Sequence, residues 1–319
     1  GGAVSRLSDV ADLLESRLPG RVQRSVPSGS FTTYRVGGPL AVVALIGDDA
    51  ALDALAGVVR RVDVPVLVVG RGSNLLVADG GFDGVAVVLG DQFERIVVDA
   101  ENASVLAGGS ASLPVLARRA AAAGVSGLEF YVGIPGSVGG AVRMNAGGHG
   151  RETRDVLVDV DLFELRDGTR STRAGTSFEF AYRHSNLGDH TVVCAARFSG
   201  SSDSPEACGE RIDAIVRWRR EHQPGGANAG SVFSNPPGDS AGRLIEATGL
   251  KGLRVGGAVV SEKHGNFVVA DRSATASDVC GLIDEVRRRV ADATGTVLET
   301  EVRLVGFAET RPIDSRGRR

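Results

Sequence analysis

The chain has 319 residues, of which 42% are hydrophobic, so it can bury a sizeable core and is long enough for two or three domains. A formal net charge of −3 excludes a global basic field that would recruit nucleic acid or an anionic membrane, and we expect small-molecule partners. Cys194, Cys208 and Cys280 are widely spaced without a CxxC pattern. We therefore expect neither a disulfide framework nor a zinc site, assign no metal ligand, and predict a reducing cytoplasmic location.

The first predicted element is an amphipathic helix near the amino terminus, where Leu7, Val10 and Leu14 recur at helical spacing. It lacks a long apolar core, so we expect neither a signal peptide nor a membrane anchor there, and nothing that spans a bilayer. Short apolar runs bounded by Gly, Pro or Asp then predict buried strands. These strands are expected at residues 41–46, 64–70 and 85–90, with a helix at 49–61.

The middle of the chain mixes helix and strand signals. A helix is predicted from Ser112, as its N-cap, to a stop at Gly124. Alternating apolar and polar residues predict a half-buried strand over 156–165, which enters a hairpin at Asp167-Gly168. Another strand is expected at 191–198. The stretch 199–206 after it is rich in Ser and is the most linker-like segment of the sequence, so we place a domain boundary there.

The last third of the chain is predicted to alternate helices and strands. Thr275 and Asp278 form a capping-box pattern at the start of a long helix that Gly295 ends. A final strand over 296–306 would place Glu299 and Glu301 on one face. The other elements expected here are a helix to about residue 221, a short helix at 241–248 and a strand at 266–270.

Two stretches of small residues carry the first functional signal, GRGSNLLV from Gly70 and GIPGSVGGAVRMNAGG from Gly133. Glycine lets backbone amides approach a ligand closely, so both stretches are typical of cradles for a diphosphate. With 44 glycines in the chain, the simpler reading is that such turns only connect strands. The first stretch lacks the third glycine of a Rossmann fingerprint and the Gly-Lys-Ser/Thr of a Walker loop, so any dinucleotide would bind to another fold.

Three further segments contain candidate chemistry. Arg183 lies in AYRHS, and its guanidinium could bind a carboxylate through two hydrogen bonds. Ser231 follows a glycine in GSVFSNPPG, and ETEVRLVG contains Glu299 and Glu301. Taken singly, each of these side chains could equally be solvated surface. Their joint occurrence favours a functional reading.

These segments, in this order and spacing, resemble the UDP-N-acetylenolpyruvoylglucosamine reductase (MurB) family of bacterial flavoenzymes. The resemblance covers most of the chain from Thr33 to Gly306 and includes AGRLIEATGLKGLRVGGAVVSEKHGNFVV. It implies an α+β fold with a two-subdomain FAD-binding region of the vanillyl-alcohol-oxidase/PCMH type and a smaller α+β substrate-binding domain. We accordingly expect the FAD-binding region at 5–198, the substrate-binding C-terminal domain at 199–307 and a tail at 308–319.

The resemblance also implies which residues bind FAD, without a covalent bond. They fall in the two glycine-rich stretches, namely Arg71, Gly72, Ser73, Asn74, Leu75, Gly133, Ile134, Pro135, Gly136, Ser137, Gly139, Gly140, Asn145 and Gly147. NADPH would be the co-substrate that reduces the flavin. The second substrate would be UDP-N-acetylglucosamine enolpyruvate, reduced to UDP-N-acetylmuramate for peptidoglycan synthesis and cell-wall growth. By resemblance the enzyme is a cytoplasmic monomer.

Three residues match the family's catalytic positions. Arg183 would bind the substrate carboxylate, and Glu301 would contact it in a protonated or proton-sharing form. Ser231 would protonate the second carbon of the enolpyruvyl group, which requires a strongly basic centre because a serine hydroxyl is a weak acid. The residues implied to line the substrate pocket are Tyr182, Asn235, Lys263, His264 and Arg219.

At a few positions this sequence departs from the family pattern, and the family's residue roles cannot be assigned there directly. His222 stands where many relatives have Lys, so a diphosphate contact there would depend on pH, and Arg219 and Arg220 are the expected substitutes. His149 replaces a commoner aromatic residue and is expected at the surface without a role. Some relatives carry an inserted tyrosine lid between the catalytic arginine and serine. The only three tyrosines, Tyr34, Tyr131 and Tyr182, all precede that interval, which predicts the shorter subtype.

Two other functions remain open at this point. Another FAD-dependent oxidase or dehydrogenase would need the glycine-rich stretches but not the segments of Ser231 and Glu301. A non-catalytic sensor of flavin or of a nucleotide sugar could be built on the same scaffold. Flavin colour in the purified protein, and its loss and return with the two substrates, would discriminate among these functions.

Overall fold

Local capping explains where several helices begin and end in the computed structural model, which describes residues 2–307. The Asp48 side chain accepts a hydrogen bond from the amide of Ala51 and starts a helix. The predicted capping box of Thr275 and Asp278 is confirmed, as is the left-handed Gly295 that ends the same helix. The helices are α1 (Gly2–Arg17), α2 (Asp49–Val59), α3 (Leu113–Ala122), α4 (Val138–Met144), α5 (Pro205–His222), α6 (Ala241–Ala247) and α7 (Ala276–Thr294).

The chain folds into two units, each assembled from separated stretches of sequence. Unit 1 combines the residues up to Ser25 with 41–71 and 83–219. Unit 2 combines 26–40, 72–82 and the residues from Arg220 onward. One division between the units therefore falls inside the first glycine-rich stretch, between Arg71 and Gly72. The domain limits inferred from the sequence stay predictions, and the tail at 308–319 lies outside the described residues.

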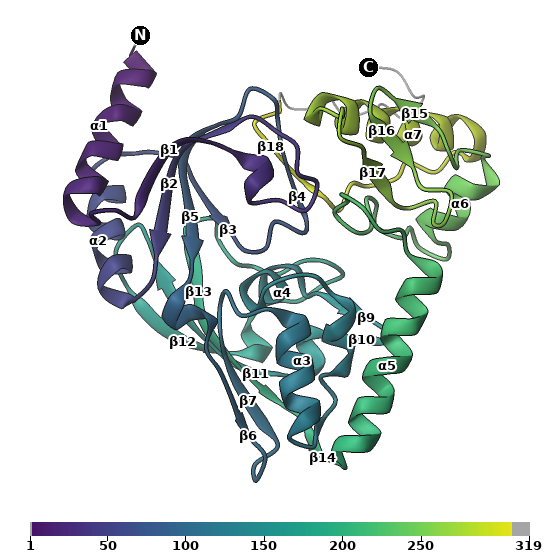
Figure 1. The fold of residues 1–319 in the computed structure, drawn as a ribbon, viewed down its shortest axis with the longest axis horizontal. Coiled ribbons are helices and arrows are strands. Elements are labelled where there is room, and N and C mark those ends of the chain that lie inside the picture. Colours follow the sequence, from purple (N-terminus) through teal and green to yellow (C-terminus); the bar gives the residue numbers. More distant parts are fainter. Residues whose placement is uncertain (1, 308–319) are drawn as a thin grey trace. The chain divides into compact units, whose positions relative to one another are not determined.

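A four-stranded sheet and two helices make the first part of unit 1. Its strands, in spatial order, are β1 (Val22–Pro27), β2 (Pro39–Ile46), β5 (Phe82–Leu89) and β3 (Val66–Val69). The predicted strands at 41–46, 64–70 and 85–90 are thus confirmed. Helices α1 and α2 lie beside one another next to this sheet (Figure 1). Their apolar faces, including the fully buried Leu14, Leu52 and Leu55, share one core with the strands.

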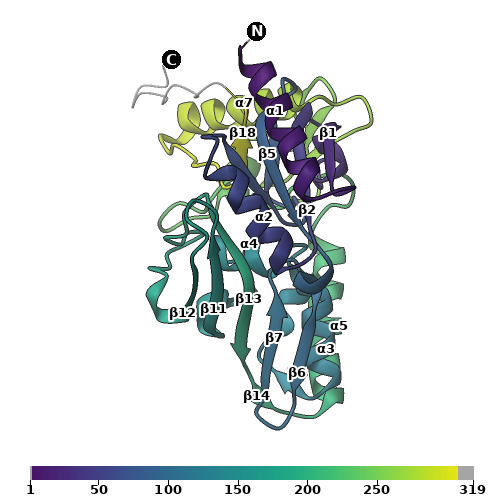
Figure 2. The ribbon, with the colours of Figure 1, turned by 90° about the vertical axis from the view of Figure 1, so that its left-hand side faces the viewer.

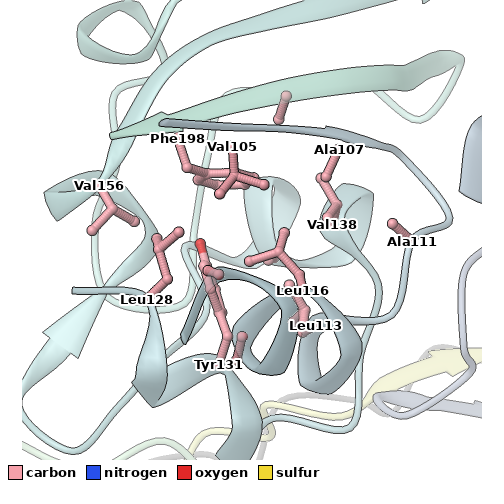
Figure 3. Packing of buried hydrophobic residues seen from close by; sticks show 14 of the residues in the cluster. Val105, Ala107, Ala111, Leu113, Leu116, Leu128, Tyr131, Val138, Val156 and Phe198 are labelled. Atoms are coloured by element: carbon pink, nitrogen blue, oxygen red, sulfur yellow. The ribbon is translucent and has the colours of Figure 1, made fainter. Parts of the chain in front are cut away.

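A five-stranded antiparallel sheet makes the second part of unit 1. Figure 2 shows its strands side by side in the order β12 (Arg170–Ala174), β11 (Leu157–Glu164), β13 (Thr191–Ser199), β7 (Ser104–Gly108) and β6 (Ile96–Asp99). The predicted hairpin after β11 is confirmed, because β12 pairs back onto it. Beneath the sheet, Leu116 of α3 and the ring of Tyr131 pack with Val105 and Phe198 (Figure 3).

The stretch that we predicted as a linker, 199–206, contains a short strand and the start of α5. Strand β14 (Ser201–Ser202) pairs with β8 (Val125–Ser126) in unit 1. The backbone amide of Asp203 donates to the carbonyl of Gly124, and the Asp203 carboxylate pairs with Arg211 of α5. These contacts anchor the start of α5 within unit 1, although the helix ends in unit 2.

Unit 2 is built around α6, α7 and a small antiparallel sheet. The sheet consists of β15 (Arg254–Val255), β16 (Ala258–Val260) and β17 (Val268–Ala270). A second pair is parallel and joins β4 (Leu75–Val77) to β18 (Arg303–Val305). Buried Tyr34, Leu76 and Phe233 belong to the same core as α7. Helices together with mainly antiparallel strand pairs give the α+β fold that the sequence predicts.

The prediction of one continuous strand over 296–306 is wrong. Only β18 forms a ladder there, and Thr300 makes an isolated bridge with Phe233. Glu299 and Glu301 precede β18, with Glu299 exposed and Glu301 half-buried. The backbone of this segment instead forms its hydrogen bonds with the loop at 232–234. These bonds replace those that a longer strand would have made with a neighbouring strand.

Candidate functional site

The two glycine-rich stretches meet in unit 1 at Gly70 and Ser137. A Cβ atom added to Gly70 would overlap the Ser137 hydroxyl, so this close approach requires that the hydroxyl stay where it is and that residue 70 have no side chain. A third glycine-containing loop, at 108–111, packs against the second stretch. The Gly139 amide donates to the Gly109 carbonyl over 2.7 Å, and a Cβ at Gly139 would lie 3.1 Å from that oxygen. Sequence reasoning missed this loop, although its Gly-Gly-Ser sequence was a signal.

Most backbone amides at the start of α4 are used within the protein. The amide of Val138 donates to Ala111, that of Gly139 to Gly109, and that of Gly140 to the Ser137 hydroxyl. The amide of Gly136 also donates internally, to Ile134. Any ligand contact of this stretch would therefore come from other groups than these four amides.

Arg71 and Ser110 are the groups in unit 1 that fit an anionic cofactor. The Ser110 hydroxyl is buried and makes no hydrogen bond to any residue within 2–307, which is costly for a buried polar group unless a ligand satisfies it. The Arg71 guanidinium lies close to Ser110, 3.5 Å from its backbone carbonyl oxygen. It also lies 3.6 Å from the Glu94 carboxylate. Both contacts are long and the Arg71 side chain is half exposed, so it can turn to a diphosphate.

Asn145 caps the end of α4 in a left-handed conformation, with φ of 42°, and is fully buried. Its side-chain amide donates to the carbonyl of Ala181 and to the carboxylate of Glu152, both over 3.1 Å. Its oxygen accepts the amide of Arg154 over 3.0 Å. Both hydrogens of the side-chain amide are thus donated within the protein.

Arg183 lies in a tight turn close to the second glycine-rich stretch. It has a positive φ of 53°, an uncommon backbone conformation for a residue other than glycine. Its guanidinium donates to the carbonyl of Gly147 over 3.2 Å and lies 4.9 Å from the ring centre of Tyr182. The Tyr182 ring is half exposed. Unit 1 thus brings a permanent positive charge to the end of this stretch.

His149 and Trp218 form an aromatic pair in unit 1. Their ring centres lie 5.0 Å apart in an edge-on arrangement, and a Cβ at Gly133 would lie 3.3 Å from the His149 ring. Partial burial of the imidazole and the nearby charge of Arg219 lower the pKa of His149. The residue is exposed, as expected, but its ring contacts Trp218 and lies against the start of the second glycine-rich stretch.

In unit 2, Val232 joins the segments of Ser231 and Glu301. The Val232 carbonyl accepts the amide of Glu301 over 2.8 Å, so the two candidate residues lie on neighbouring backbone segments. The Glu301 carboxylate oxygen Oε2 is buried. Asn74, from the first glycine-rich stretch, donates its side-chain amide to the Glu301 carbonyl over 3.1 Å, and its own carbonyl accepts the amide of Arg303.

Asn266 holds the Ser231 loop and was missed by sequence reasoning. Its buried side chain donates to the carbonyl of Phe233 over 2.8 Å and accepts the Phe233 amide over 2.9 Å. Its own carbonyl accepts the amide of Val232 over 2.9 Å. A single asparagine after a glycine carries no pattern that would have identified it, because its partners lie 33 positions away.

The remaining candidate residues of unit 2 are more exposed. The exposed Lys263 donates its ammonium group to the backbone carbonyl of Arg220. The Nδ1 atom of His264 accepts the amide of Asn266 over 3.1 Å, and burial lowers the pKa of His264, with His222 contributing in the same direction. The Asn235 side chain accepts the amide of Ala241 at the start of α6.

Comparison with known proteins identifies both halves of this chain. A family model for an FAD binding domain matches residues 39–172. A model for the C-terminal domain of UDP-N-acetylenolpyruvoylglucosamine reductase matches residues 222–305, the range that contains Ser231 and Glu301. Arg183 and Arg219 lie between the two matched ranges.

Several relatives match nearly the whole chain. A UDP-N-acetylenolpyruvoylglucosamine reductase of Rhodopseudomonas palustris (strain BisB5) is 41% identical, over 94% of this chain and 97% of the relative. One of Heliobacterium modesticaldum is 43% identical, over 90% of this chain and 91% of the relative. The crystal structure of UDP-N-acetylenolpyruvylglucosamine reductase from Thermus caldophilus has a TM-score of 0.78 at 38% identity, and the match covers 89% of this chain and 99% of that one.

Proposed function

The chain belongs to the UDP-N-acetylenolpyruvoylglucosamine reductase family, and from this premise we propose that it reduces UDP-N-acetylglucosamine enolpyruvate to UDP-N-acetylmuramate. It is an FAD-dependent oxidoreductase whose reductant is NADPH, and its product serves peptidoglycan synthesis. We place it in the cytoplasm as a monomer. Within residues 2–307, no helix is both long and apolar enough to cross a bilayer.

The observation that carries the proposal is the junction in unit 2 at Val232. There the backbone of Glu301 is hydrogen-bonded to the residue after Ser231, and Asn74 of the first glycine-rich stretch is bonded to Glu301. A hydroxyl, a carboxylate and part of the proposed cofactor segment therefore share one small region. An oxidase acting on another substrate, or a sensor, would have no need of this junction.

The proposed FAD contacts are the residues assigned in the two glycine-rich stretches, with Arg71 and Gly72–Leu75 in the first, except Asn145, whose side-chain amide donates both of its hydrogens within the protein. When bound, the reduced flavin supplies a hydride to the terminal carbon of the enolpyruvyl group. The negative charge that develops on the substrate carboxylate must then be stabilised, because this charge separates the transition state from the bound substrate.

Arg183 and Glu301 are the proposed partners of that carboxylate. The Arg183 guanidinium is held beside the second glycine-rich stretch by Gly147, and its charge is permanent, so it attracts the carboxylate most strongly as negative charge accumulates. Glu301 contacts the carboxylate in a protonated or proton-sharing form, since two unprotonated carboxylates would repel each other.

Ser231 is the proposed proton donor. Its hydroxyl gives a proton to the carbon next to the one that receives hydride, so the double bond becomes a single bond with one hydride and one proton added. Asn266 fixes the loop that carries this hydroxyl. Substrate positioning is assigned to five side chains, namely Tyr182, Asn235, Lys263, His264 and Arg219.

The test follows flavin colour in the purified holoenzyme. We expect a yellow protein that anaerobic NADPH bleaches and that UDP-N-acetylglucosamine enolpyruvate, but not UDP-N-acetylglucosamine, restores to yellow. A colourless protein that gains no flavin on incubation with FAD would favour the sensor. A flavoprotein that NADPH bleaches but that the enolpyruvyl substrate leaves bleached would overturn the assigned substrate.

A further inference from the structure

A buried asparagine in the second glycine-rich stretch contacts the turn that contains Arg183. Asn145 is the left-handed residue after α4, and its side-chain amide donates to the carbonyl of Ala181 over 3.1 Å. Ala181 is the first residue of the turn that contains Arg183, because its amide and carbonyl both hydrogen-bond to His184. Asn145 therefore holds the start of this turn.

A second contact holds the side chain of the same arginine. The Arg183 guanidinium donates over 3.2 Å to the carbonyl of Gly147, two residues after Asn145. One short segment thus fixes both the backbone turn and the charged end of Arg183. The geometry points to Asn145 as a positioning residue that sets where the Arg183 guanidinium lies relative to the stretch 133–148, an inference that rests on the function proposed above.

Glu152 and Arg154 determine the orientation of the Asn145 amide. The Glu152 carboxylate accepts from the Asn145 nitrogen over 3.1 Å and pairs with the Arg154 guanidinium at 2.8 Å. The Asn145 oxygen accepts the backbone amide of Arg154 over 3.0 Å. An amide turned the other way would place its oxygen against Glu152 and the Ala181 carbonyl, so these neighbours select one orientation.

This arrangement gives Asn145 a different role from a cofactor ligand. Both hydrogens of its side-chain amide are donated within the protein, so the side chain has no donor left for a phosphate. The αL conformation of Asn145 also makes a clean substitution available. Glycine adopts φ of 42° without strain, and Asn145→Gly therefore removes the side chain while leaving the backbone turn acceptable.

The experiment measures each half-reaction in the holoenzyme with Asn145→Gly. We expect the affinity of the apoprotein for FAD and the rate of flavin reduction by NADPH to stay within about threefold of the unmodified protein. The rate of reoxidation by the enolpyruvyl substrate should fall about 10- to 100-fold. The decisive measurement is a double-mutant cycle with Arg183→Ala. If Asn145 acts through Arg183, adding Asn145→Gly to Arg183→Ala slows reoxidation by no more than about twofold further.

A second variant covers the case in which Asn145→Gly folds poorly. Glu152→Ala removes one acceptor of the same amide, and we expect a smaller loss confined to reoxidation, again absent in the Arg183→Ala background. The positioning role would be overturned if the factors by which the two substitutions slow reoxidation multiplied in either double variant. A loss of FAD affinity as large as the loss of reoxidation rate would also overturn it. Failure of the proposed function is recognised separately, because the unmodified, NADPH-reduced protein would then not be reoxidised by the enolpyruvyl substrate.

Discussion

Asn74 donates its side-chain amide to the backbone carbonyl of Glu301 over 3.1 Å, across 227 positions of the sequence. The Asn74 carbonyl in turn accepts the amide of Arg303, so Asn74 contacts the chain on both sides of Val302. The first glycine-rich stretch therefore has a structural role beside the ligand contacts proposed for it. It fixes the backbone that carries the proposed carboxylate.

Replacing Asn74 with alanine should weaken this connection. We expect Asn74→Ala to lower the free energy of unfolding by about 1 kcal/mol and to slow reoxidation of the flavin by substrate, because Glu301 loses its anchor. Denaturant unfolding and stopped-flow absorbance measure the two effects. Asn228→Ala is the matched control, since the Asn228 amide bonds only within its own turn, to Gly226 and Gly230. Equal losses of rate in the two variants would contradict the anchoring role.

Ser231→Ala should separate the two half-reactions. Removing the proposed proton donor leaves flavin reduction by NADPH near normal and slows reoxidation by substrate by orders of magnitude. Anaerobic stopped-flow spectra resolve both steps. Ser234→Ala, three residues further along the same loop, should leave both steps intact. The proton-donor role fails if Ser231→Ala slows both half-reactions to the same extent.

Ser110→Ala should lower the affinity for FAD without lowering the stability of the apoprotein. The Ser110 hydroxyl makes no hydrogen bond to the part of the chain that the structure describes, so its removal costs the fold little, while the proposed hydrogen bond to a charged phosphate is lost. We expect FAD affinity to fall about 10-fold, measured by flavin fluorescence during titration of the apoprotein. Thr191→Val is the control, because that hydroxyl bonds to Glu164 within unit 1. A Ser110 variant that binds FAD normally would exclude the contact.

His149 should give the stability a pH dependence below neutrality. Its pKa is lowered in the folded protein, so the unfolded chain binds a proton first as the pH falls, and the folded state loses stability from about pH 6.5 downward. Melting temperatures between pH 5 and 8 measure this loss, which should be smaller in His149→Gln. Trp218, the single tryptophan of the chain, reports the same titration by fluorescence of the apoprotein. An identical pH profile in His149→Gln would refute the assignment.

Arg183→Gly should be more stable than Arg183→Ala although both slow reoxidation of the flavin by substrate. The positive φ at this position is unfavourable for any residue with a Cβ, and glycine relieves it. We expect a difference of about 1 kcal/mol in the free energy of unfolding, after allowing for the greater flexibility of glycine in the unfolded chain. Denaturant unfolding of the two variants measures it. A more stable Arg183→Ala would show that the turn is not strained.

The sequence predicted the elements whose causes are local. The capping box at Thr275, the hairpin at Asp167-Gly168 and the buried strands each depend on residues that lie close together in the chain. The N-cap position of Ser112 was also predicted, but its side chain makes no capping bond, and the Leu113 amide beside it donates to Gly136 in the second glycine-rich stretch. A local pattern thus located the helix start without revealing the contact that holds it.

The candidate site depends on contacts that local patterns do not contain. The family resemblance selected Ser231 and Glu301, but nothing near either residue indicates that Val232 joins their segments. The buried amides of Asn145 and Asn266 are similar cases, since each serves distant backbone and each would be expected at the surface from its residue type. Long-range hydrogen bonds account for most of what the sequence could not predict.

The discontinuous make-up of unit 2 has a consequence for synthesis on the ribosome. Residues 26–40 and 72–82 emerge early, yet the rest of unit 2 begins at Arg220, and β4 pairs with β18 close to the carboxyl end. The nascent chain must therefore hold these two segments without the rest of unit 2 until the residues from Arg220 onward have been synthesised. A ribosome that stalls before Arg303 would release a polypeptide in which β4 has no β18 to pair with.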